Sequence, residues 1–328
     1  MRSTSRRFAR TGVAALGCFG LALGATALTP AFGSTPATHA AAAKPAAAAK
    51  PAAHQAQAAA TVGSRYLALG DSVPFGYREA NSIPAPDFNR PTTFIGYPED
   101  VATNLGLKVT NAACPGETTA SFINASAQSN GCENSFSKGA KHPTPIGYRT
   151  LYPLHATYTG PKESQLTFAE HFLTKHPNTK LVSLMIGAND GFICLERTSD
   201  SCFKEFAALQ AAITKNVTKI LKGIRNKAHY KGQFVIVSYW SLNYHNSLDN
   251  LESQGLNSAL KKAAKGFDVK FASGYNQFRL ASQQGHGDPC AAGLLTALSG
   301  KDKGTCGVHP SLAGAAVLAQ AVERVVKK

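Results

Sequence analysis

The chain has 328 residues, of which 44% are hydrophobic, enough for one large core or two small ones. The formal net charge is +15 at pH 7, but residues 1–60 contribute six Lys and Arg and no acidic side chain, so the rest of the chain carries +9. The basic residues form no patch interleaved with aromatic side chains and match no nucleic-acid-binding motif, which argues against a nucleic-acid partner.

Residues 1–40 have the layout of a secretory signal peptide. Four arginines precede an apolar stretch from Val13 to Leu28, and small residues follow it, with a candidate cleavage site at 38–40. Gly and Thr interrupt the apolar stretch, which falls short of the ~18 continuous apolar residues typical of a membrane-spanning helix. We therefore predict a signal peptide and an extracellular protein, with the Sec and Tat export routes both open.

The segment 41–62 consists almost entirely of Ala, Lys, Pro and Gln. It offers too little apolar surface to offset the entropy cost of ordering, so we predict a linker. The folded domain is then expected to span 63–328.

Apolar runs rich in β-forming residues alternate with helical patterns after the linker. The expected strands are Tyr66–Leu69, Leu181–Ile186, Phe234–Tyr239 and Val269–Ala272, with a weaker one at Val109–Ala112. Apolar residues at helical spacing predict helices within 163–176, 203–228 and 311–328. Strands that are apolar on both faces, alternating with helices, predict a three-layer α/β sandwich around a parallel sheet, in a single domain.

Polar motifs follow the first three expected strands. Ser72 lies in "GDSV" after the first strand, Gly116 in "CPGETT" after the second, and Asn189 in "GAND" after the third. Ligands of such folds bind at the carboxyl ends of the strands, so we expect these motifs to lie together on one edge of the sheet. The Pro- and Asn-rich segments 78–100 and 121–161 are expected as large loops that shape a substrate cleft.

These residues match the needs of acyl transfer to a serine. Ser72 is the candidate nucleophile, and His309 in "GVHPSLAG" is the candidate base. The backbone amides of Ser72 and Gly116 and the side-chain amide of Asn189 are candidate donors for the oxyanion. Each motif alone is also a common turn or helix start, and Val73-Pro74 after the serine excludes the Gly-x-Ser-x-Gly nucleophile elbow.

Taken together, the four motifs resemble those of the SGNH/GDSL hydrolases, which supply Ser, Gly, Asn and His in this order. The match runs from about Tyr66 to the C-terminus. The resemblance implies a flavodoxin-like three-layer α/β/α sandwich with a central parallel sheet. It also implies hydrolysis of carboxylic esters through an acyl-enzyme on Ser72, without a cofactor.

One position departs from the pattern of that family. The family usually carries Asp three residues before the His, where it orients the imidazole, and here that position is Cys306. The backbone carbonyl of Cys306 is one candidate acceptor for the Nδ1 proton of His309. Asp302 and Asp288, in the preceding loop, are the alternatives. We favour the carbonyl, because a disulfide would hold Cys306 in place.

Six cysteines remain once Cys18 leaves with the signal peptide. An even number in an exported chain suggests three disulfides, although sequence alone allows 15 pairings, and the absence of a Cys-x-x-Cys motif argues against a metal site. The chain especially resembles the secreted, three-disulfide lipases and esterases of the family. We hypothesise the pairs Cys114–Cys132, Cys194–Cys202 and Cys290–Cys306, each of which would clamp one catalytic loop.

The sequence therefore predicts a secreted serine ester hydrolase acting on lipid or other acyl esters. The alternative within this class is a polysaccharide O-acetyl esterase, and the alternative outside it is a non-catalytic binding module on the same fold. We expect no metal, no cofactor, no nucleic acid and no stable protein partner, and we expect a monomer. The acyl-chain length remains open, because the loops that build the cleft set it.

Overall fold

The computed structural model describes residues 64–135 and 146–327. The predicted signal peptide (1–40) and linker (41–62) lie outside the described residues, so both stay predictions. Within the described ranges, no helix is long and apolar enough to cross a membrane.

Five parallel strands form the central sheet of the described chain. They are β1 (Arg65–Gly70), β2 (Lys108–Asn111), β3 (Leu181–Met185), β4 (Gln233–Val237) and β5 (Lys270–Ala272). Their order, β2-β1-β3-β4-β5, is that of flavodoxin. Every residue of β3 is buried, as are all but the first residue of β1 and of β4, so these strands read as continuous apolar runs. All five strands occur where the sequence predicted them.

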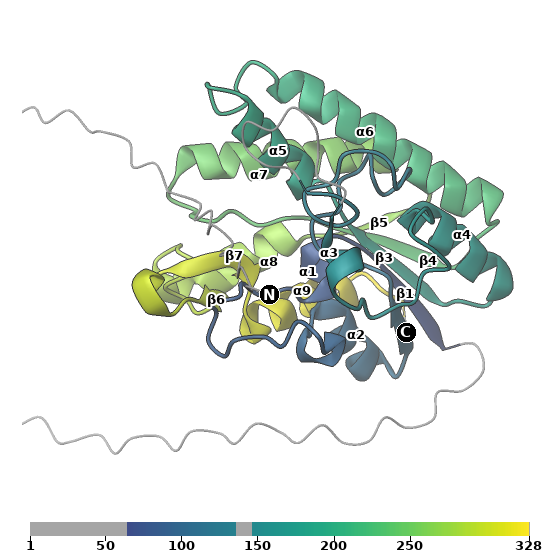
Figure 1. The fold of residues 1–328 in the computed structure, drawn as a ribbon, viewed down its shortest axis with the longest axis horizontal. Helices are drawn as coiled ribbons and strands as arrows, with labels where there is room; N and C mark the ends of the chain where they lie inside the picture. Colours follow the sequence, from purple (N-terminus) through teal and green to yellow (C-terminus); the bar gives the residue numbers. More distant parts are fainter. Residues whose placement is uncertain (1–63, 136–145, 328) are drawn as a thin grey trace, which may run out of the picture. The chain divides into compact units, whose positions relative to one another are not determined.

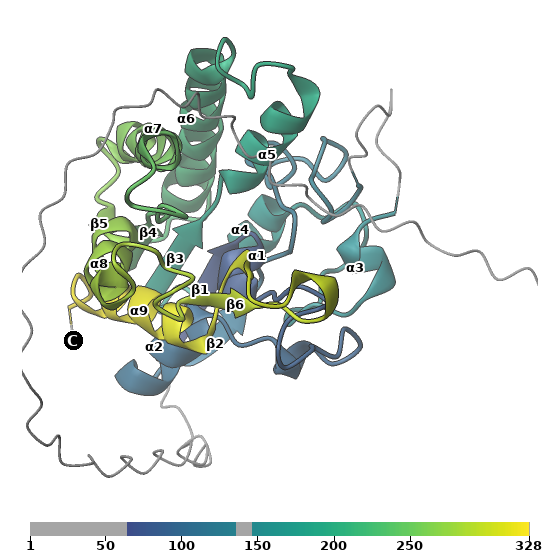
Figure 2. The ribbon, with the colours of Figure 1, turned by 90° about the vertical axis from the view of Figure 1, so that its left-hand side faces the viewer.

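Helices cover both faces of this sheet (Figures 1 and 2). On one side lie α4 (Gln165–Lys175), α6 (Phe206–Lys222) and α7 (Ser247–Ala264). On the other side lie α2 (Tyr97–Leu105), α8 (Gly274–Ala281) and α9 (Leu312–Glu323). The remaining α-helices of the described chain are α1 (Ser72–Phe75), α3 (Tyr148–Leu151) and α5 (Ala188–Arg197). This arrangement confirms the flavodoxin-like α/β/α sandwich.

The predicted helical regions contain α4, α6 and α9, and α6 continues into a π-helical turn at Gly223–Lys227. The structure adds helices that the apolar pattern did not reveal. The buried face of α7 includes Asn257, whose side chain bonds both the N–H and the C=O of Tyr239, so apolar periodicity is weak there. The C-terminal end of the expected loop 78–100 is already helical, because α2 begins at Tyr97, where Glu99 accepts a hydrogen bond from the Gly96 amide at 2.9 Å.

A second, two-stranded antiparallel sheet stands apart from the central one. It pairs β6 (Leu295–Ala297) with β7 (Cys306–Pro310), and the disulfide Cys290–Cys306 joins the segment before β6 to the first residue of β7. Most of β7 is partly exposed, so its sequence lacks the apolar signature of a buried strand. This hairpin carries His309.

Candidate active site

Ser72 lies where β1 turns into α1, at the carboxyl edge of the sheet. Gly70 has a φ of +134°, and a Cβ there would collide with the backbone of β3, so glycine permits the close approach of the two strand ends. Asp71 then caps α1 by accepting a hydrogen bond from the Val73 amide at 3.0 Å. These local contacts fix the direction in which the side chain of Ser72 leaves the backbone.

Asp71 is fully buried beneath the candidate nucleophile. Its second carboxylate oxygen accepts a hydrogen bond from the hydroxyl of Tyr239, which follows β4. Burial raises the pKa of Asp71 to about 6, although the hydrogen bonds from Tyr239 and Val73 oppose that rise. Asp71 is therefore a structural anchor that connects the turn after β1 to the end of β4.

His309 reaches Ser72 from the β6–β7 hairpin. Its Nε2 lies 2.9 Å from the Ser72 Oγ, the geometry of a base and its nucleophile. The ring of Tyr77 packs edge-on against the imidazole, with the ring centroids 4.9 Å apart. The structure thus brings together two predicted residues that are 237 positions apart in the chain.

The residue that holds the other side of the imidazole differs from the predicted one. Nδ1 of His309 lies 2.8 Å from Oε1 of Glu79, so the expected bond to the Cys306 carbonyl is not made. The alternative acids are engaged elsewhere, since Asp302 accepts from the Asn81 side chain and Asp288 from the Cys290 amide. Sequence reasoning missed Glu79 because it belongs to no family motif and meets His309 only through the fold.

Two of the candidate oxyanion donors, Gly116 and Asn189, both contact Asn130. Gly116 has a φ of +85°, and a Cβ there would press on the backbone of Asn130. The Asn130 amide donates to the Gly116 carbonyl at 2.7 Å, and its side chain donates to Oδ1 of Asn189 at 3.0 Å. One N–H of the Asn189 side chain donates to the carbonyl of Glu117 at 3.1 Å, and its second N–H is the candidate oxyanion donor. Asn130 lies in the expected loop 121–161 and carried no sequence signal.

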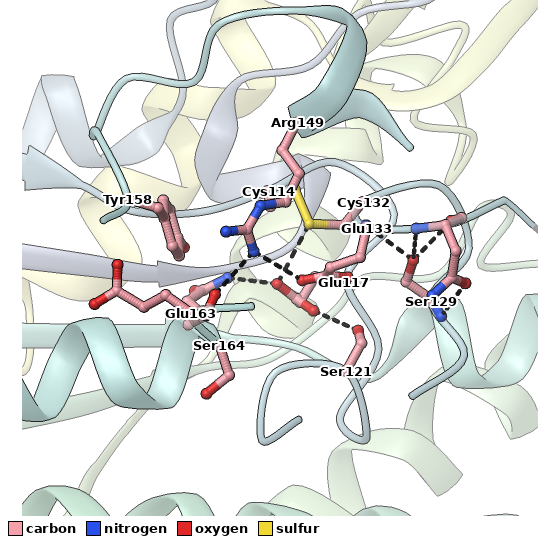
Figure 3. A network of polar contacts seen from close by, with 12 residues as sticks. Cys114, Glu117, Ser121, Ser129, Cys132, Glu133, Arg149, Tyr158, Glu163 and Ser164 are labelled. Carbon is pink, nitrogen blue, oxygen red and sulfur yellow. Dashed lines mark hydrogen bonds and ion pairs between the residues drawn. A yellow bond between two sulfur atoms is a disulfide. The ribbon is translucent and has the colours of Figure 1, made fainter. Parts of the chain in front are cut away.

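A buried polar network around Glu117 holds the loop that contains Gly116 (Figure 3). The Glu117 side chain accepts hydrogen bonds from Ser121 and from Gln165, the latter at 3.0 Å. Gln165 in turn exchanges two hydrogen bonds with the backbone of Gly70, so the end of β1 and the Gly116 loop share one scaffold. Burial and the negative charge of Glu133 hold the pKa of Glu117 well above its usual range.

Arg149 is also part of this network (Figure 3). Its guanidinium lies 3.2 Å from the Glu133 carboxylate and 4.3 Å from the centre of the Tyr158 ring, and it also donates to two backbone carbonyls. Both partners of this ion pair are almost fully buried, so loss of either one would leave a charge without its counterion.

All three hypothesised disulfides are present. The bonded pairs are Cys114–Cys132, Cys194–Cys202 and Cys290–Cys306, with Cα–Cα distances of 5.7, 5.4 and 5.7 Å. Cys114, Cys132 and Glu117 also form the one grouping of potential metal ligands in the described part of the chain. Because both sulfur atoms belong to a disulfide, this grouping is not a metal site.

An apolar cavity of about 170 Å³ opens beside Ser72 and His309. Its walls come mainly from α5, α6, α7 and the segment after β4. Its apolar lining includes Phe192, Leu209, Ile213, Trp240, Leu242 and Leu256. Phe192 and Leu242 are partly exposed, at 37% and 40%, which leaves apolar surface facing solvent at the cavity. The site therefore pairs a nucleophile with a binding space for an apolar group.

Residues 68–317 match the GDSL-like lipase/acylhydrolase family, and the chain belongs to this family. It is therefore a carboxylic ester hydrolase. The sequence has no significant match among curated proteins.

Solved structures of similar fold include several ester hydrolases. Phospholipase A1 from Streptomyces albidoflavus is 17% identical, with 80% of this chain and 98% of that chain covered and a TM-score of 0.48. A mutant of Axe2, an acetyl-xylooligosaccharide esterase from Geobacillus stearothermophilus, is 16% identical, with 82% and 96% covered and a TM-score of 0.47. A lipase from a goat rumen metagenome is 15% identical, with 79% and 96% covered and a TM-score of 0.46.

Proposed function

We propose that this protein is a secreted serine hydrolase that cleaves esters of lipid-like acyl chains through an acyl-enzyme on Ser72. The observation that carries the proposal is the 2.9 Å contact between Ser72 Oγ and His309 Nε2 beside an apolar cavity. The contact supplies an activated nucleophile, and the cavity supplies a place for an apolar acyl chain.

In the first half of the reaction, His309 removes the Ser72 proton as Oγ attacks the ester carbonyl. The negative charge on the carbonyl oxygen is met by the amides of Ser72 and Gly116 and the side chain of Asn189. The C–O bond to the alcohol then breaks, and the imidazolium protonates the departing oxygen. The products of this step are the free alcohol and the Ser72 ester.

In the second half, water takes the place of the alcohol. His309 removes one proton from the water, and the hydroxide attacks the acyl-enzyme carbonyl. The same donors stabilise the second oxyanion, and Ser72 leaves with the proton that His309 returns. The free acid is released and the enzyme returns to its starting state.

The cavity favours lipid-like acyl groups over the polysaccharide O-acetyl alternative. An acetyl group has a single methyl to bury, whereas the apolar walls built by α5, α6 and α7 contribute favourable burial only to a longer chain. The non-catalytic alternative leaves the Ser72–His309 contact without a purpose. Acyl-chain preference therefore separates these hypotheses.

Export and assembly are part of the same proposal. The charged-then-apolar layout of 1–40 and the three disulfides support an extracellular location, since disulfides persist in oxidising compartments. The proposed site draws all its groups from one chain, which supports a monomer without a stable partner. N-terminal sequencing of protein recovered from the medium tests the export, and sedimentation tests the monomer.

The decisive assay is hydrolysis of p-nitrophenyl esters with acyl chains from C2 to C16, with Ser72→Ala run in parallel. We expect a maximum above acetate for the wild type and loss of turnover in the variant. A maximum at acetate would support the polysaccharide O-acetyl esterase instead. Absence of turnover at every length by folded, oxidised protein would contradict the proposed function.

A further inference from the structure

Both carboxylate oxygens of Glu79 contact the β6–β7 hairpin that carries His309. Oε1 lies 2.8 Å from His309 Nδ1 and accepts a hydrogen bond from the Val308 amide at 2.9 Å. Oε2 accepts a hydrogen bond from the hydroxyl of Thr296 in β6, a residue that is almost fully buried. Both oxygens are therefore held by the hairpin, and the side chain is only 21% exposed.

The backbone of β7 is shaped to admit this carboxylate. Gly307 lies two residues before His309, and a Cβ at that position would overlap the carboxyl carbon and both oxygens of Glu79. Its φ is not in the left-handed region, so the requirement for glycine here comes from the space that Glu79 occupies. Glu79 and Gly307 thus fit one another across a sequence separation of more than 200 residues.

The charge of Glu79 is retained at this position. Burial by itself raises the pKa of the carboxyl, but the hydrogen bond and positive charge of His309, together with the Thr296 hydroxyl, lower the pKa to about 2. A carboxylate at Nδ1 selects the tautomer that carries its proton on Nδ1, so the lone pair of Nε2 faces Ser72. It also stabilises the imidazolium that forms when Ser72 loses its proton.

We propose that Glu79 is the positioning residue of this hydrolase, taking over from the loop after Ser72 the role that the family usually gives to an Asp three residues before the His. The inference rests on the proposed function of Ser72 and His309. It explains how Cys306 can serve the disulfide with Cys290 while His309 still has an anionic partner. Thr296 and Gly307 complete the arrangement, one by holding the carboxylate and the other by making room for it.

Other charged groups near the imidazole do not compete for this role. Asp71 interacts with the charge of His309, but its oxygens accept hydrogen bonds from Val73 and Tyr239. The ring of Tyr77 packs edge-to-face with the imidazole, and its phenol is uncharged at neutral pH because its pKa, which burial raises to about 12, lies far above 7. Among these groups, Glu79 is the acid whose carboxylate is hydrogen-bonded to Nδ1 of His309.

The main test is Glu79→Gln, which keeps the shape of the side chain and removes its charge. We expect kcat/KM for a p-nitrophenyl ester to fall about 10²- to 10⁴-fold, mostly through kcat, as when the acid of a serine-protease triad is neutralised. The acidic limb of the pH profile should move to lower pH, because the imidazolium loses its anionic partner. Thr296→Val removes the hydrogen bond that holds Oε2, so it should change the profile and lower kcat/KM by a smaller factor.

Asp302→Asn is the matched control, because it is the same carboxylate-to-amide change in the same hairpin and keeps an acceptor for Asn81. It should leave both kcat/KM and the pH profile within about threefold of wild type. Circular dichroism checks that each variant is folded. If Glu79→Gln does not fold, the same measurements on Thr296→Val and Gly307→Ala test the role of Glu79. Unchanged pH profiles of kcat/KM in both variants would overturn the inference.

A second readout separates this inference from the proposed function. A fluorophosphonate probe labels an activated serine, so its rate of reaction with Ser72 can be followed across pH without an ester substrate. Wild-type protein that neither turns over esters nor labels contradicts the proposed function itself. Wild-type protein that labels at the same rate and pH dependence as folded Glu79→Gln contradicts only the role of Glu79.

Discussion

At the scale of single residues, Asn130 connects the candidate oxyanion donors. Its backbone amide bonds Gly116, and its side chain bonds the oxygen of the Asn189 amide. The second bond fixes which end of the Asn189 amide carries the N–H groups toward the Glu117 carbonyl and the proposed oxyanion site. We therefore expect Asn130 to act through Asn189 and not through the substrate.

Substitution at these two positions should have graded effects on turnover. Asn189→Ala should lower kcat about 10²- to 10³-fold, as for loss of one oxyanion donor. Asn130→Ala should lower kcat less, because the Asn189 donor remains but its orientation is no longer held. Asn124→Ala, an exposed asparagine of the same loop, serves as the control and should have no effect. Unchanged kcat in Asn189→Ala would remove Asn189 from the oxyanion site.

At the scale of elements, the β6–β7 hairpin and helices α6 and α7 complete the proposed site at the carboxyl edge of the sheet. The β6–β7 hairpin delivers His309, whereas α6 and α7 build the walls of the apolar cavity. The cavity lies between helices whose sequences show no sign of a binding site, because the same apolar residues would serve equally well as core. Substitutions on α6 or α7 should therefore change the volume of the cavity without altering Ser72 or His309.

Narrowing the cavity should shorten the preferred acyl chain. Leu209 on α6 lines the cavity and is only partly buried, so Leu209→Trp adds bulk there with little strain on the core. We expect kcat/KM to fall at least about tenfold for long-chain p-nitrophenyl esters and to stay within about threefold for acetate. Leu280→Trp, on the exposed side of α8, is the control. An equal loss at all chain lengths would show that acyl chains do not enter this cavity.

At the scale of the whole molecule, several carboxyl groups are buried and have raised pKa values. Burial raises the pKa of Asp71 and of Asp190 to about 6 and that of Glu99 to about 7, and it raises the pKa of Glu117 well above its usual range. Unfolding therefore releases protons whenever the pH lies between the ordinary carboxyl values near 4 and these raised values. Over that window these four carboxyls bind more protons in the folded state than in the unfolded state, whereas burial lowers the pKa of His155, which acts in the opposite direction below its ordinary pKa.

Stability should consequently decrease as the pH rises from about 5 to about 7. Thermal unfolding followed by circular dichroism at a series of pH values checks this, and the midpoint should be higher near pH 5 than near pH 8. Glu117→Gln, which cannot ionise, should flatten the decrease, whereas Glu205→Gln on the surface should not. A midpoint that rises steadily toward pH 8 in the wild type would contradict the raised pKa values of these buried carboxyls.

The amino-acid sequence by itself determined the strands and the four motifs of the proposed active site. Strands buried on both faces must be apolar along their whole length, so β1, β3 and β4 are legible as local runs. Ser72, Gly116, Asn189 and His309 were identified because each stands in a short motif that resembles one of a known family. The three cysteine pairs were hypothesised as bridges that clamp these loops, and the structure contains all three.

Only the tertiary structure decided the partner of His309 and the space beside Ser72. Glu79 bonds His309 across 230 residues of sequence. The need for glycine at position 307 is visible only in the structure, where the Glu79 carboxylate occupies the space of a Cβ. The sequence directed attention to Cys306, Asp302 and Asp288 because they are close to His309 along the chain, whereas the imidazole bonds whatever lies close to it in space. The cavity walls likewise come from separate helices, and no local pattern encodes the distance between them.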